Sequence, residues 1–308
     1  MSTNVNTNAI AVGVPGANAE LDLVMPRRPL TARFRKWISD QPLGAVSLLF
    51  VVFTIFVAIF APQIAPYDPV EAHYDQMMQA PSAQYWLGTD QYGRDVLSRI
   101  IFGARTALYI GFTSAILGAT LGLILGVGSA YFSGWVDLVF QRIMDVFLAF
   151  PLIILALAAV AVFGTGPDKV ILAIIFPFVP RCARVVRSGA LAIREMPYVD
   201  AARALGYGHM RIILRHMVPN CVASYLIMLT TFLGQAILIE ASLSYLGLGV
   251  QEPIPAWGLM LQGGAEEYAE SAMWIAVFPG LAITLAVFAF NLFGDALRDT
   301  LDPKLRSR

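Results

Sequence analysis

Long stretches without Asp, Glu, Lys or Arg recur along the chain. A helix needs about 20 mainly apolar residues to cross the ~30 Å hydrocarbon core of a bilayer. Most of the stretches reach this length. The shorter stretch 170–180 reaches it only if the helix extends toward Arg187 and its charged ends lie at the membrane surface. The pattern predicts an all-α integral membrane protein with about six transmembrane helices, in the intervals 41–67, 106–136, 146–167, 170–180, 216–239 and 271–294.

These intervals also predict how the chain is divided. The first 25 residues are rich in Asn, Thr, Gly and Ala without periodicity, which is typical of disorder. We expect an N-terminal tail (1–42), a first transmembrane helix (43–64), an outer segment with a helix on the membrane surface (65–103), a region of five further helices (104–296) and a C-terminal tail (297–308). The first apolar run is too long for a signal peptide, so we interpret it as an uncleaved span.

Composition supports a membrane protein. Hydrophobic residues make up 57% of the chain and charged residues only 14%, whereas soluble proteins carry about 25% charged residues. The formal net charge is +0, which gives no indication of nucleic-acid binding. The two cysteines, Cys182 and Cys221, cannot form a disulfide framework, and we expect free thiols.

The distribution of basic residues predicts the orientation. Sixteen of the 21 Lys and Arg residues lie in the N-terminal tail, in 181–215 or in the C-terminal tail. Since cytoplasmic loops are enriched in Lys and Arg, both termini are expected on the cytoplasmic side. Arg94, Arg99 and Arg105 go against this rule, and we expect a short surface helix at 91–102, supported by Asp-to-Arg pairs four residues apart.

Three glycines form a close-packing motif in the second apolar segment. Gly118, Gly122 and Gly126 are each four residues apart, a spacing that allows another helix to approach closely. The partner helix belongs either to this chain or to another subunit.

The most polar stretch inside the hydrophobic region is 185–220. Pro197 suits a first helical turn, and Gly206 occupies a C-cap position after the helix-forming run 200–205. A second short helix follows, and Pro219 precedes the next span. The expected apolar face of this second helix consists of Met210, Ile213, Leu214 and Met217. Such a loop either only orients the protein or has a mechanical role.

The order of residues in this loop resembles the EAA loop of bacterial ABC importer permeases. Asp200-Ala201-Ala202 is followed by Gly206 and Pro219, with Asp200 replacing the usual Glu at a shorter reach. Four further blocks resemble the C-type permease subunit of dipeptide and oligopeptide importers, and the likeness extends from about residue 30 to the C-terminus. These blocks are 86–108, 142–157, 244–261 and 291–306.

The resemblance implies a type-1 ABC importer permease in the bacterial inner membrane. Peptides are the expected cargo, and nickel, glutathione, opines or sugars are the alternatives within the family. A homologous second permease, one or two cytoplasmic ATPase subunits and a periplasmic substrate-binding protein are the implied partners. The implied coupling residues, which dock on the ATPase, are Asp200, Ala201, Ala202, Gly206, Arg211 and Pro219.

Other mechanisms lack their usual residues. The sequence contains no GxxxxGK phosphate loop, no HExxH and no GxSxG, so we expect neither an enzyme nor a bound metal or cofactor. An ATP-independent secondary transporter would normally need several intramembrane charges. Glu240 is the one acidic residue deep in its segment, and either makes a structural polar contact or lines the transport pathway.

Overall fold

The computed structural model describes residues 35, 37–266, 268 and 270–301. The chain divides into two compact units, and the boundary in the sequence lies between Asp40 and Gln41. In the N-terminal unit, residues 37–40 are helical. Most of the predicted N-terminal tail, including its expected disorder, lies outside the described residues. So do residues 302–308 of the predicted C-terminal tail.

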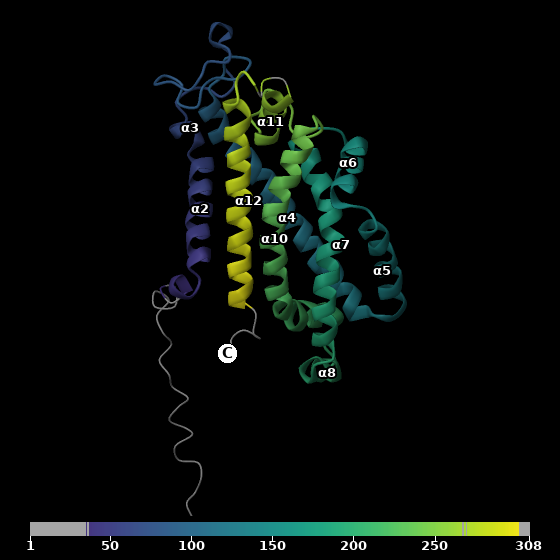
Figure 1. The fold of residues 1–308 in the computed structure, drawn as a ribbon. Coiled ribbons are helices and arrows are strands. Elements are labelled where there is room, and N and C mark those ends of the chain that lie inside the picture. Colours follow the sequence, from purple (N-terminus) through teal and green to yellow (C-terminus); the bar gives the residue numbers. More distant parts are fainter. Residues whose placement is uncertain (1–34, 36, 267, 269, 302–308) are drawn as a thin grey trace, which may run out of the picture. The chain divides into compact units, whose positions relative to one another are not determined.

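The main unit is built from helices, which confirms the predicted fold class. Within the described residues the β-structure is one isolated bridge, between Thr89 and Asp95. Long helices run side by side, with α8 at one end and α3 and α11 at the other (Figure 1). The elements are α2 (Pro42–Ile59), α3 (Ala61–Ile64), η2 (Tyr74–Gln76), α4 (Val96–Phe132), α5 (Gly134–Leu148), α6 (Leu152–Phe163), α7 (Pro167–Arg194), α8 (Pro197–Ala204), α9 (His209–Ile212), the π-turn η3 (Ile213–Met217), α10 (Val218–Tyr245), α11 (Trp257–Glu266) and α12 (Trp274–Leu301).

Four of the described helices are long and apolar enough to cross a membrane, and a fifth span arises if the pair α5 and α6, bent by 92°, counts as one. The uncertain sixth span of the sequence, 170–180, lies inside α7, a helix of 28 residues. Its second half carries several arginines, which lowers its apolar character. Two of them are paired with carboxylates of α5, Arg184 with Asp145 and Arg187 with Asp137. α7 therefore continues as one helix beyond its apolar part, and these pairs join its charged second half to α5.

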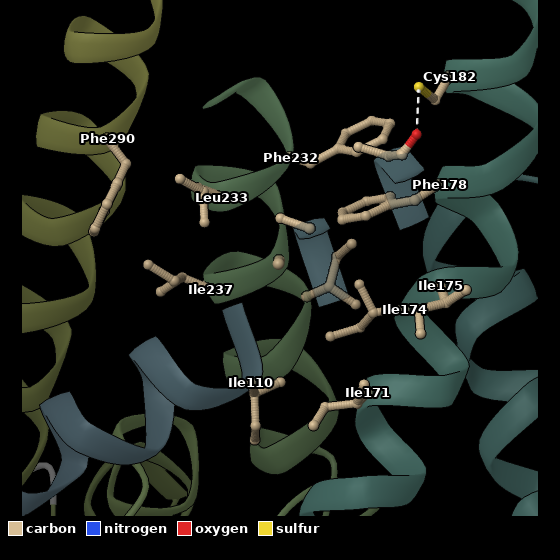
Figure 2. Packing of buried hydrophobic residues seen from close by; sticks show 14 of the residues in the cluster. Ile110, Ile171, Ile174, Ile175, Phe178, Cys182, Phe232, Leu233, Ile237 and Phe290 are labelled. Carbon is tan, nitrogen blue, oxygen red and sulfur yellow. Dashed lines mark hydrogen bonds between the residues drawn. The ribbon is translucent and has the colours of Figure 1, made fainter. Parts of the chain in front are cut away.

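The core lies where α4, α7 and α10 meet. Phe178 of α7 stacks on Phe232 of α10, with ring centroids 4.0 Å apart (Figure 2). Cys182 is buried and its thiol donates a hydrogen bond to the carbonyl of Ala119 on α4. Isoleucine and leucine side chains of all three helices fill the space around these contacts.

The glycine row of α4 faces α7 of the same chain. A Cβ added at Gly118 would lie 2.8 Å from Cβ of Phe178, and one at Gly122 would lie 2.4 Å from Cβ of Cys182. At Gly126 it would lie 2.5 Å from the carbonyl oxygen of Ala183. The two backbones therefore approach too closely for any side chain, and of the two predicted alternatives the packing is within the chain.

The start of α4 corrects one prediction. Residues 91–102 are not a separate surface helix, because α4 begins at Val96 and continues without interruption to Phe132. Asp95 caps its first turn by accepting a hydrogen bond from the backbone N–H of Ser98 at 2.8 Å. The carboxylate of Asp95 is thereby used as a helix cap rather than in the expected pair with Arg99.

Candidate functional site

The short helix α8 is formed by local signals in its sequence. Pro197 occupies the first turn, where its missing N–H is not needed. Asp200 lies in the first turn and accepts a hydrogen bond from Arg203 at 2.8 Å, on the exposed side of the helix. Val199 and Ala202 are buried, whereas Asp200 and Ala201 are exposed. Of the two alanines expected to allow close approach of a partner, only Ala201 faces outward.

Gly206 ends α8 as predicted. Its φ is +74°, in the left-handed region that costs other residues roughly 1 kcal/mol or more. The N–H groups of Gly206 and Tyr207 donate to the carbonyls of Arg203 and Ala202, which closes the helix. A Cβ at Gly206 would meet nothing within 4 Å, so the requirement for glycine comes from the backbone angle and not from space.

The second half of the loop differs from the prediction. A helix runs from His209 through the π-turn into α10, so Pro219 lies within a continuous helix and does not precede it. Pro219 has no N–H for the usual helical bond, and the wider turn directly before it accommodates the mismatch. Of the predicted apolar face, Met210 and Leu214 are exposed while Met217 is buried. Ile212, outside that prediction, is buried instead.

A mixed apolar and basic surface results at this end of the bundle, which we name the α8 surface. Arg211 stacks on the ring of Tyr207, 4.0 Å from its centroid, and thereby stiffens the turn after Gly206. Large apolar side chains are exposed around it, as expected for a surface that a protein partner covers. The α8 surface consists of the basic residue Arg211 and five exposed apolar residues. The apolar residues are Met196, Tyr198, Leu205, Met210 and Leu214, with exposed fractions of 45%, 44%, 72%, 66% and 59%.

The loop is fixed to the end of α4 by contacts that the sequence did not indicate. The hydroxyl of Tyr131 lies 2.7 Å from Nδ1 of His209, and the two rings meet edge to face. The guanidinium of Arg203 lies 5.9 Å from the centroid of the same tyrosine ring. Nearby, Asp137 of α5 pairs with Arg187 of α7 and accepts a hydrogen bond from Ser129 of α4. Tyr131 and His209 are 78 residues apart, so no local pattern reveals the pair.

An ion cluster closes the opposite end of the bundle, with Asp90, Arg94 and Arg99 buried and the side chain of Glu252 40% exposed. Arg94 donates to Asp90 and to Glu252, each at 2.7 Å. The expected Asp90–Arg94 pair is therefore present, but it lies in the non-helical segment before α4 and not within a helix. Arg99 is 1% exposed and lies 3.3 Å from the same Glu252. Burial raises the pKa of Glu252, but the hydrogen bond from Arg94 and the charge of Arg99 outweigh it and hold that pKa below its ordinary value. The cluster joins the segment before α4 to the loop after α10.

Comparison with known proteins identifies the family. The model for the inner membrane component of binding-protein-dependent transport systems matches residues 94–307, and the model for the N-terminal TM domain of oligopeptide transport permease C matches residues 31–81. The chain belongs to this permease family. It is the membrane-embedded permease component of an ABC importer, as the sequence predicted.

Two relatives cover most of the permease. The dipeptide transport system permease protein DppC of Alkalihalophilus pseudofirmus is 42% identical over 88% of this chain and 89% of its own. The glutathione transport system permease protein GsiD of Escherichia coli is 44% identical over 89% of each chain. Among solved structures, a chain of the MetNI methionine ABC transporter has a TM-score of 0.54 at 19% identity, over 67% of this chain and 97% of that one. The last comparison concerns the fold alone.

Family membership agrees with the expected lack of catalysis by the permease itself. Components of this family are non-catalytic and work with a separate ATPase and a substrate-binding protein. Among the described residues, no group of three or more His, Cys, Asp or Glu side chains could hold a metal. Cys182 and Cys221 are buried free thiols, as expected.

Glu240, a candidate pathway residue, is enclosed by the permease in this conformation. Its side chain is 1% exposed and accepts a hydrogen bond from Ser244 at 2.8 Å. The hydroxyl of Ser244 in turn accepts a hydrogen bond from the backbone N–H of Val250 at 3.0 Å. The contact through Oε1 is structural, whereas Oε2 is buried without a hydrogen-bond partner among the described residues, and the pathway-lining role of Glu240 stays a prediction.

Proposed function

We propose that the permease is the C-type subunit of an ATP-driven importer of short peptides. The match to the N-terminal domain of oligopeptide permease C supports the C-type assignment. The cargo class is supported by relatives named for dipeptide and for glutathione, which is itself a tripeptide, at more than 40% identity along most of the chain. Peptides are therefore favoured over nickel, opines or sugars.

The α8 surface is proposed to dock on the ATPase subunit. The observation that carries this role is that α8 projects at one end of the helix bundle (Figure 1). Apolar and basic side chains on and beside it are exposed, among them Tyr198, Leu205 and Arg211. A short helix with a left-handed stop at Gly206 keeps a fixed direction relative to α7 and α9. Asp200, Ala201 and Arg211 are exposed and can contact the partner directly, whereas Ala202 is buried and supports the loop from within. Pro219 is exposed as well, but it lies beyond the π-turn, within α10.

The proposed assembly pairs this permease with a homologous second permease, and the pathway lies between the two. A periplasmic binding protein delivers the peptide to the end that carries α3 and α11. Both termini lie in the cytoplasm in this arrangement, because the first residue of α2, α8 and the last residue of α12 share one end of the main unit (Figure 1). The clustering of basic residues in 181–215 agrees with this orientation.

Uptake and cross-linking together test the proposal. Cells lacking this gene are expected to lose uptake of tritiated dialanine or of tritiated glutathione, and the wild-type gene should restore it. An Ala201→Cys variant should cross-link to the ATPase subunit in membranes, whereas Gln63→Cys, exposed in α3 at the opposite end, should not. Because the two native cysteines, Cys182 and Cys221, are buried, they should not form background cross-links.

Two results would contradict the proposal. Unchanged uptake of both peptides in the deletion strain would contradict the proposal that the importer carries peptides. Equal cross-linking from Ala201→Cys and Gln63→Cys, or no cross-linking from either variant, would contradict the proposal that α8 docks on the ATPase.

A further inference from the structure

Tyr131 connects three elements at the inner end of the bundle. It lies one residue before the end of α4 and is only 8% exposed. Its hydroxyl meets Nδ1 of His209 in α9 at 2.7 Å, and its ring lies beneath the guanidinium of Arg203 in α8. One side chain of a membrane-spanning helix therefore contacts both short helices of the docking loop.

On the α4 side, the connection through Tyr131 leads into a tightly packed part of the bundle. α4 packs against α7 through glycines that leave no room for a single added carbon, and it also contacts α10 and η3. Closely packed helices transmit a displacement instead of absorbing it, because their interface has no free volume. A shift of the loop at His209 would therefore move the end of α4, and α7 would have to follow.

We propose that Tyr131 is a positioning residue that passes the movement of α8 and α9 to α4 through its hydrogen bond with His209. This inference rests on the proposed docking of α8 to the ATPase. It assigns the step after docking to one side chain, and it predicts that transport and ATP hydrolysis become uncoupled when the bond is removed.

Tyr131→Phe isolates the hydrogen bond, because the ring and its packing remain. In the complete complex we expect uptake of tritiated dialanine to fall about two- to tenfold, the range that corresponds to the net contribution of one hydrogen bond. ATP hydrolysis by the purified complex and co-purification of the ATPase should stay at the wild-type level. His209→Ala removes the same hydrogen bond together with the ring that meets Tyr131, so it should lower uptake at least as much.

Non-additivity is the decisive readout. The Tyr131→Phe/His209→Ala double variant should transport no more slowly than His209→Ala alone, because that variant has already removed the bond that Tyr131→Phe removes. Tyr109→Phe is the matched control, since it removes a tyrosine hydroxyl that lies 3.3 Å from Asp168 near the other end of α4. Its uptake should equal that of the wild type.

The inference is overturned if either single variant transports normally, if the two effects add, or if ATPase co-purification falls in parallel with uptake. The Ala201→Cys cross-link separates this inference from the proposed function. A missing cross-link overturns the docking role of α8 and this inference with it. A cross-link together with normal uptake by Tyr131→Phe overturns this inference alone.

Discussion

Gly126→Ala is predicted to destabilise the permease although it adds only one methyl group. The new Cβ would lie 2.5 Å from the carbonyl oxygen of Ala183 and 3.1 Å from its Cα. Both atoms belong to the backbone of α7, so no side-chain rotation can remove the clash. The two helices must separate locally by several tenths of an ångström, which loosens the contacts around Phe178 and Cys182.

The magnitude follows from two opposing contributions. Overpacking a tight interior typically costs about 1–3 kcal/mol. Replacing glycine by alanine within a helix returns up to about 1 kcal/mol through helix propensity. The 2.5 Å contact with backbone places the overpacking cost in the upper part of its range, at about 2–3 kcal/mol, so we expect a net loss of about 1–2 kcal/mol. Gly128→Ala is the matched control on the same helix, because a Cβ there meets nothing within 4 Å and only the favourable contribution remains.

Thermal unfolding of the purified permease in detergent measures the difference. The five tryptophans provide an intrinsic fluorescence signal. We expect the midpoint of Gly126→Ala to fall by about 2–8 °C, from roughly 2–4 °C per kcal/mol. The midpoint of Gly128→Ala should equal or exceed that of the wild type. A Gly126→Ala midpoint as high as that of Gly128→Ala would show that α4 and α7 separate without cost, and would refute the close-packing argument.

Three further predictions concern the two ends of the bundle. Because the pKa of Glu252 is held below its ordinary 4.5, its stabilising contribution is present above that pH and is lost as the pH falls further. Glu252→Gln should therefore lower the unfolding midpoint at pH 7, and the difference from the wild type should vanish in acid; a difference independent of pH would contradict this. Gly206→Val should preserve membrane abundance but abolish ATPase co-purification and uptake, whereas reduced abundance would make the residue purely structural. A phosphatase reporter fused after Arg308 should be inactive and one inserted within 247–256 active, and the reverse pattern would exclude cytoplasmic termini.

Charge spacing predicted the helices well and their ends less well. Intervals without charge located the apolar centres of α2, α4, α10 and α12. They missed the first ten residues of α4, because Arg99 and Arg105 interrupt the interval although both lie within the helix. Arg99 is tolerated there through Glu252, a partner 153 residues away, and such distant compensation leaves no mark on local composition.

The loop between α7 and α10 shows the same division between local and distant causes. The end of α8 at Gly206 depends on one backbone angle and could be predicted from neighbouring residues. The continuation through Pro219 could not, because the π-turn before it changes the helical register and with it the buried face. The pair Tyr131–His209 depends on how α4 and α9 meet in space, which periodicity within either segment does not determine.

The ion cluster at the N-terminal end of α4 also has a consequence for biosynthesis. Arg94 and Arg99 leave the ribosome more than 150 residues before Glu252. At about 5–20 residues per second, roughly 8–30 seconds pass before their second carboxylate is made. During this interval Asp90 is the carboxylate already available to both arginines. The N-terminal end of α4 is therefore completed late in synthesis, and in a nascent chain that stops before Glu252 the two arginines share Asp90 as their ion-pair partner.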